Sequence, residues 1–123
     1  MIYLAERFKD AVAVLVGDGP IKQRLTTAYL EYLDDLEHDE LPVELRAAFS
    51  DLHLALHQVK PASREPCVRA SVRKMSSSEA SAHAESIVML FSELVRQGYR
   101  AGPLKVVRGE KKMALPSFLA GDS

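Results

Sequence analysis

The chain has 123 residues, 47% of them hydrophobic and 27% charged, with a formal net charge of −1. Its length suits a single domain that buries roughly two-thirds of its unfolded surface, and its near-neutral charge excludes general binding to polyanions, so no nucleic-acid partner is expected. The single cysteine, Cys67, excludes an intrachain disulfide and a thiolate-rich metal site.

Two amphipathic helices are predicted in the first third of the chain, where apolar residues recur at three- and four-residue steps. The first helix ends at the turn Gly17 to Pro20, and the second runs from Pro20 to about His38. Acidic residues crowd the end of the second helix, where the helix macrodipole disfavours negative charge. We interpret them as a solvated surface, and the alternative is a docking patch for a basic partner.

A third helix follows Pro42, with apolar residues at helical spacing from Leu45 to Val59. Residues 60–66 are then expected to form a surface loop. The segment 68–75 fits either two helical turns or a strand, because its apolar residues satisfy both periods. We favour a short helix, since the chain offers no convincing partner strand.

The clearest predicted helix spans residues 76–98, and we expect the other segments to pack around it. Ser76 and Glu79 have the spacing of a capping box, which pairs two of the backbone N–H groups that a helix start leaves free. Either Gly98 or Gly102, the latter followed by Pro103, is predicted to end the helix. Its apolar stripe consists of Ala80, Ala84, Ile87, Val88, Phe91, Leu94 and Val95.

These four main helices, joined by short connections, predict an all-α fold: an antiparallel four-helix bundle with an additional short helix and an extended C-terminal tail. Residues 1–103 are expected to form the single domain, and residues 104–123 a partly disordered C-terminal arm. The charged N-terminus is unlike a signal peptide, and no stretch approaches the roughly 20 apolar residues of a membrane span. A cytoplasmic protein without membrane contact is therefore expected.

Two histidines, His53 and His57, lie four residues apart on the third predicted helix and so share one face, a spacing at which helical histidines bind zinc. A complete site needs a third ligand, which would have to come from His83, Glu79 or the acidic end of the second helix. Because two ligands alone make a weak site, we predict neither a metal nor another cofactor.

An anion site is conceivable at the start of the 76–98 helix, where cations and hydroxyls adjoin unpaired N–H groups. The alternative is that Glu79 completes the capping box, that the arginines pair with the acidic end of the second helix, and that nothing binds. The candidate residues are Arg69, Arg73, Lys74, Ser76, Ser77 and Ser78.

No catalytic residue is identified, because the sequence shows no nucleophile with a base and an orienting group. The function predicted is a non-enzymatic protein-interaction or regulatory module that self-associates as a homodimer, and the alternative is a binder of a phosphorylated small molecule or nucleic-acid phosphate at the helix start. Several apolar residues fall off the helical stripes, among them Leu30 and Leu54. The predicted partner-binding residues are Met89, Leu90, Leu115 and Phe118.

Overall fold

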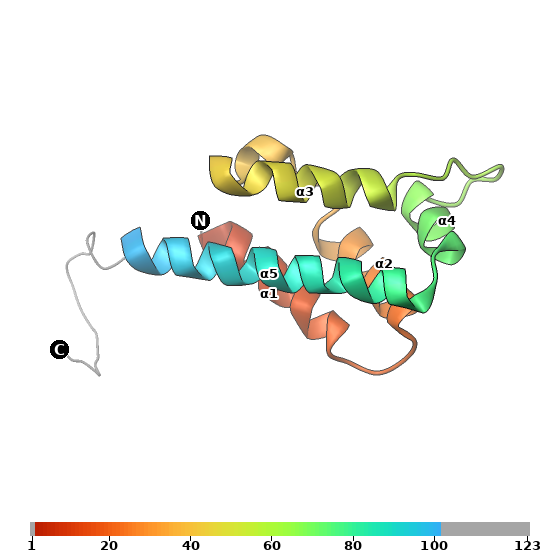
Figure 1. Ribbon diagram of the computed structural model, residues 1–123, viewed down its shortest axis with the longest axis horizontal. Helices are drawn as coiled ribbons and strands as arrows, with labels where there is room; N and C mark the ends of the chain where they lie inside the picture. Colours follow the sequence, from red (N-terminus) through yellow and green to blue (C-terminus); the bar gives the residue numbers. More distant parts are fainter. Residues whose placement is uncertain (1, 102–123) are drawn as a thin grey trace.

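The protein is all-helical over residues 2–101, the part that the computed structural model describes, and no strand occurs there. The all-α part of the prediction is thereby confirmed, whereas the C-terminal arm lies outside the described residues. No helix in this part of the chain is long and apolar enough to span a membrane. The elements are α1 (Ile2–Leu15), α2 (Ile21–Tyr32), the 3₁₀ helix η1 (His38–Glu40), α3 (Val43–Leu56), α4 (Cys67–Lys74) and α5 (Ser77–Ala101) (Figure 1).

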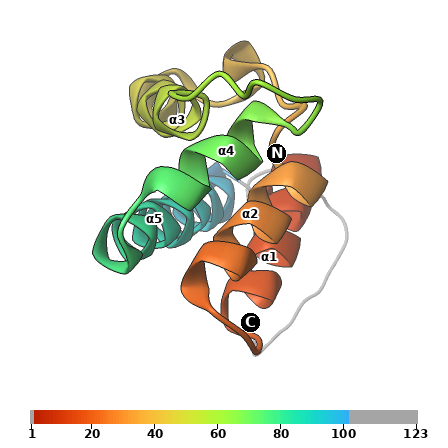
Figure 2. The ribbon, with the colours of Figure 1, turned by 90° about the vertical axis from the view of Figure 1, so that its right-hand side faces the viewer.

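The long helix α5 packs against α1, α2 and α3, as expected for the segment around which the others gather. Helix α1 contacts both α2 and α5, and α3 has its main contacts with α4, α5 and η1 (Figure 2). Phe8 of α1 and Phe49 of α3 are almost completely buried and meet edge to face, with ring centroids 6.2 Å apart. Such aromatic pairs stabilise a core beyond their buried area, so this contact ties α3 to the rest of the fold.

Helix α2 ends at Tyr32, six residues earlier than the sequence predicts. Arg7 of α1 donates a hydrogen bond from Nε to the Tyr32 carbonyl oxygen, 2.7 Å away, and its guanidinium also pairs with Asp35. The Arg7 guanidinium therefore supplies a donor to a carbonyl group at the C-terminal end of α2, and it neutralises one of the acidic residues that follow this helix. Residues 33–37 turn away from the helix axis instead of extending it and lead into η1.

The short helix α4 confirms the helical alternative for the segment 68–75. Its buried Ser71 accepts a hydrogen bond at Oγ from the Val59 N–H, at 2.9 Å. Val59 was predicted to lie in the third helix, but α3 ends at Leu56 and the Val59 N–H bonds to Ser71 instead of to a helix carbonyl. A buried backbone donor needs a partner, and Ser71 supplies it from the neighbouring helix.

The start of α5 is a capping box, as predicted: the Ser76 N–H donates to Glu79 Oε1 at 2.8 Å, and the Glu79 N–H donates to Ser76 Oγ at 3.0 Å. At the other end the helix continues through Gly98 to Ala101, so Gly98 is not the stop. A glycine inside a helix is costly but tolerated, because it keeps its backbone hydrogen bonds.

The buried face of α5 differs from the predicted stripe. Leu90, which was expected to fall off the buried stripe, is 3% exposed and belongs to the core. Val88 and Val95, expected in the stripe, are exposed. The reason is that α3 packs on the Leu90 side of α5 and moves the centre of the buried face toward that side.

Candidate functional site

A groove runs between α3 and α5, two helices that lie alongside each other in Figure 1. It has a volume of about 610 Å³ and is the first of two candidate sites considered in the part of the chain that the structure describes. Residues three or four apart on each helix line it, because this spacing returns to the same helical face. The apolar lining residues are Leu45, Ala48, Leu52, Ala82, Met89 and Leu90.

The polar residues of the groove are mostly acidic. Asp51, Glu85 and Glu93 line it together with His83 and Ser86. Asp51 and Glu85 are exposed, whereas Glu93 forms an ion pair with Arg96. A concave apolar surface with an acidic edge favours a ligand that carries both apolar and basic side chains.

Met89 is the most accessible large apolar residue of the groove lining, with 64% of its surface exposed. Its long unbranched side chain adapts to different partners, which is why methionine is common at binding surfaces. Its neighbour Leu90 contributes to the same groove from the core side. Of the predicted partner-binding residues, Met89 thus lies where a partner can reach it, while Leu115 and Phe118 lie outside the described residues.

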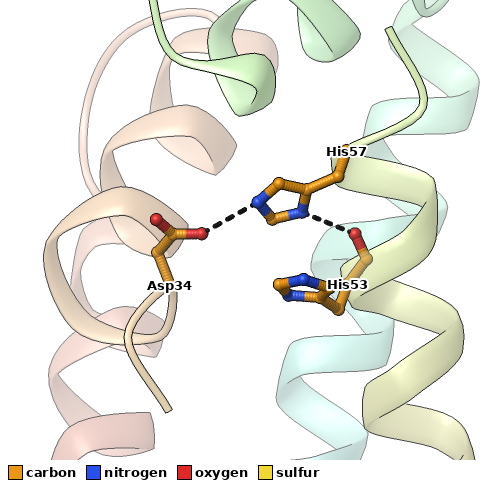
Figure 3. A group of neighbouring side chains, drawn as sticks. All are labelled: Asp34, His53 and His57. Carbon is orange, nitrogen blue, oxygen red and sulfur yellow. Dashed lines mark hydrogen bonds and ion pairs between the residues drawn. The ribbon is translucent and has the colours of Figure 1, made fainter. Parts of the chain in front are cut away.

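The second place is a cluster of three side chains that joins the segment after α2 to α3: Asp34, His53 and His57 (Figure 3). Each offers one ligand-type atom, and the three atoms lie within 4.8 Å of one another. The His53 and His57 rings stack, with centroids 3.9 Å apart. Asp34 comes from the acidic end of the second helix, one of the sources that the sequence allows for a third ligand.

Each histidine of the cluster has a partner at Nδ1. His57 Nδ1 donates to the His53 carbonyl oxygen at 2.7 Å, and His53 Nδ1 lies 2.8 Å from the buried Tyr29 hydroxyl. Burial and the neighbouring His57 lower the pKa of His53, which keeps its imidazole neutral at pH 7. Burial, together with the nearby Asp34, raises the pKa of Tyr29, so its hydroxyl stays protonated.

The carboxylate of Asp34 faces His57: its Oδ1 atom lies 3.1 Å from His57 Nε2. Oδ1 is shielded from solvent and accepts no hydrogen bond from any residue that the structure describes. A buried carboxylate oxygen is costly unless a cation or a donor compensates it. The His57 ring compensates this oxygen only when its Nε2 atom carries a proton.

The residues of the predicted anion site are exposed, but several of them already have partners. Arg73 donates two hydrogen bonds to Glu65, at 2.7 and 2.5 Å, instead of pairing with the acidic end of α2. This ion pair lowers the pKa of Glu65. Ser76 is occupied by the capping box with Glu79. A carboxylate thus already lies at the start of α5, which weakens the case for a second anion there.

Comparisons with protein-family models, curated proteins and solved structures found no match to this chain. The assignment of the groove and the cluster as candidate sites therefore depends on their geometry alone. Sequence reasoning did not identify the groove, because its two walls are 30 or more residues apart in the chain and only packing brings them together. Asp34 and Tyr29 were likewise not singled out, although the paired histidines were a signal that a third polar group was needed.

Proposed function

We propose that the protein is a non-enzymatic, self-associating interaction module in which residues 104–123 of one copy dock in the α3–α5 groove of a second copy. The observation that carries this proposal is the groove itself, with its apolar lining and acidic edge. The scaffold we propose for it is the antiparallel arrangement of α1, α2, α3 and α5, in the reducing cytoplasm that a single thiol suits.

Charge complementarity supports this choice of ligand. The segment 104–123 contains Lys105, Arg108, Lys111 and Lys112, opposite in sign to the carboxylates of Asp51 and Glu85 at the groove. Opposite charges across an interface accelerate association and select the partner, even where they add little net affinity.

The apolar residues of the same segment match the apolar lining of the groove. Leu115 and Phe118 follow the cations and supply apolar anchors for a groove that also contains Met89. A few buried apolar anchors dominate the free energy of such interfaces, while the charged edge contributes specificity.

The direction of α5 favours a second copy over the same chain. The last turns of α5 extend past the end of α3 (Figure 1), so the helix carries the chain beyond the groove and away from it. Docking in the same chain would require the chain to turn back toward the groove after α5. Reciprocal docking between two copies instead closes a two-fold dimer in which both grooves are filled.

Sedimentation equilibrium of the full chain tests this function. We expect a dimer at micromolar concentration that dissociates as salt rises, since the charged contacts are screened. Reversing both exposed groove carboxylates, Asp51→Lys with Glu85→Lys, is expected to give a monomer with unchanged helicity. The matched control is Glu6→Lys with Glu31→Lys, which makes the same change in net charge at exposed positions away from the groove.

A monomer at high micromolar concentration and moderate salt contradicts the proposal. Equal loss of the dimer in the groove variant and in the control variant also contradicts it, because the effect would then come from net charge. With either result, the remaining ligands for the groove would be the chain's own C-terminal segment or a different protein.

A further inference from the structure

We propose that Asp34, His53 and His57 bind one divalent cation of the zinc class, which joins the segment after α2 to α3. This site is independent of the proposed self-association. It lies apart from the groove, because none of its three residues lines the groove. The inference rests on the orientation of the two imidazoles and on the buried oxygen of Asp34.

The orientation of His57 is fixed by its Nδ1 atom. The His53 carbonyl oxygen 2.7 Å away can only accept, so Nδ1 carries the proton. In the neutral imidazole, Nε2 then presents a lone pair, and this lone pair lies 3.1 Å from Asp34 Oδ1. Two electron-rich atoms this close repel each other unless a proton on Nε2 or a metal ion lies between them, and we propose the metal ion.

His53, like His57, has a hydrogen-bond partner at Nδ1. Its Nδ1 atom has a hydroxyl partner in Tyr29, which leaves Nε2 as the remaining ring nitrogen. A metal-bound histidine commonly has a hydrogen-bond partner on its other nitrogen, which fixes the tautomer and the ring orientation. When the metal binds Nε2, the Nδ1–H of His53 donates to the Tyr29 oxygen. Both histidines of the cluster thus have the outer partner that a metal site requires.

Asp34 supplies the third donor and a negative charge. Its Oδ1 atom is buried and accepts no hydrogen bond from the residues that the structure describes, so its charge is compensated only by a proton on the facing His57 Nε2 or by a metal ion. The Asp34 and His57 side chains are both partly exposed, and a cavity of about 380 Å³ borders Asp34 and His53. Solvent therefore reaches the cluster, and water can complete the coordination.

Two imidazole nitrogens and one carboxylate oxygen favour zinc, cobalt, nickel or copper over magnesium and calcium, which prefer oxygen ligands alone. Zinc bonds of about 2.0–2.2 Å in a tetrahedron separate neighbouring ligand atoms by roughly 3.3–3.6 Å. The 3.1 Å between Asp34 Oδ1 and His57 Nε2 is close to that range, and all three atoms lie within 4.8 Å of one another. Because the two imidazole rings are stacked, their side chains have to rotate before both lone pairs point at one ion.

The test is calorimetric titration of the full chain, without an affinity tag, with Zn²⁺ after dialysis against a chelator. We expect saturable binding of one ion and a rise in melting temperature, since an ion that binds only the folded state stabilises it. Co²⁺ titration followed by visible absorption is expected to show a low-symmetry site with nitrogen and oxygen ligands. Magnesium at the same concentration is expected to show no binding.

Variants assign the ion to the cluster. His57→Ala and the nearly isosteric Asp34→Asn are expected to abolish saturable binding, and circular dichroism verifies that both remain folded. Tyr29→Phe, which removes only the outer partner of His53, is expected to weaken binding about 10- to 100-fold. His83→Ala is the control, because His83 belongs to α5 and lines the groove.

Two results would overturn the inference. The first is the absence of saturable Zn²⁺ binding to the native chain, in which case Asp34 and His57 form only an ion pair. The second is binding that survives both His57→Ala and Asp34→Asn or that disappears in His83→Ala, because the ion would then be held elsewhere.

Discussion

The adjacent residues Met89 and Leu90 provide a direct test of how α5 packs. The sequence treats both as apolar residues outside the stripe, whereas Leu90 is 3% exposed in the fold and Met89 is 64% exposed. Changing each to alanine keeps the helix propensity of α5 high, so the two variants differ mainly in what they remove from the core.

Leu90→Ala removes buried methyl groups and leaves a cavity, a change that costs about 2–5 kcal/mol in protein cores. Because Leu90 also lines the open groove, part of that cavity is accessible to solvent, and we expect the lower half of the range, about 2–3 kcal/mol. Met89→Ala removes a mostly exposed side chain and is expected to change the free energy of unfolding by less than about 0.5 kcal/mol.

The assay is urea unfolding of both variants and the native chain, followed by circular dichroism at one fixed protein concentration, since self-association shifts apparent stability. For a chain of this size the loss at Leu90 corresponds to a fall in melting temperature of about 6–15 °C. Equal effects of the two substitutions, or a loss below about 1 kcal/mol at Leu90, would refute the packing of α3 on this side of α5.

Three further substitutions test contacts that hold the fold. Ser76→Ala removes the capping box and is expected to destabilise the protein by about 1 kcal/mol in thermal unfolding, whereas alanine at another exposed serine of α5 has little effect. Tyr29→Phe leaves His53 without its hydroxyl partner and is expected to cost about 0.5–1.5 kcal/mol in chemical denaturation. Arg73→Ala is expected to raise the pKa of Glu65 toward its ordinary value in an NMR titration. Because the folded-state pKa of Glu65 is lowered, the stability it contributes is present above its unfolded pKa and is lost as pH falls through the folded value, and this dependence disappears in the variant.

The helices and their caps could be predicted from sequence because they depend on local chemistry. The stop at Gly17 to Pro20 and the capping box at Ser76 both follow from residues within a few positions of one another, whereas α4 was favoured over a strand because the chain offered no partner strand. The end of α2 could not be predicted, since it depends on Arg7, a residue of another helix. Contacts between distant residues have no signature in a helical period.

In the candidate sites too, local features could be predicted from the sequence and contacts between distant residues could not. The spacing of His53 and His57 was visible in the sequence, and the acidic end of the second helix was among the possible sources of a third ligand. Only the turn after Tyr32 brings Asp34 to the histidines. The exposure of Val88 and the burial of Leu90 depend on which side of α5 receives α3, and the apolar pattern alone does not determine that side.

The central claim, that a C-terminal segment of one copy docks in the groove of another, is tested most directly by mixing two charge-reversed chains. One chain has Asp51→Lys with Glu85→Lys in the groove, and the other has Lys111→Glu with Lys112→Glu in the segment. Each alone is expected to be monomeric in sedimentation equilibrium, because its own grooves and segments repel. The mixture is expected to form a heterodimer, since both of its groove and segment pairs are again complementary. Monomers in the mixture, or dimers of either variant alone, would contradict the account.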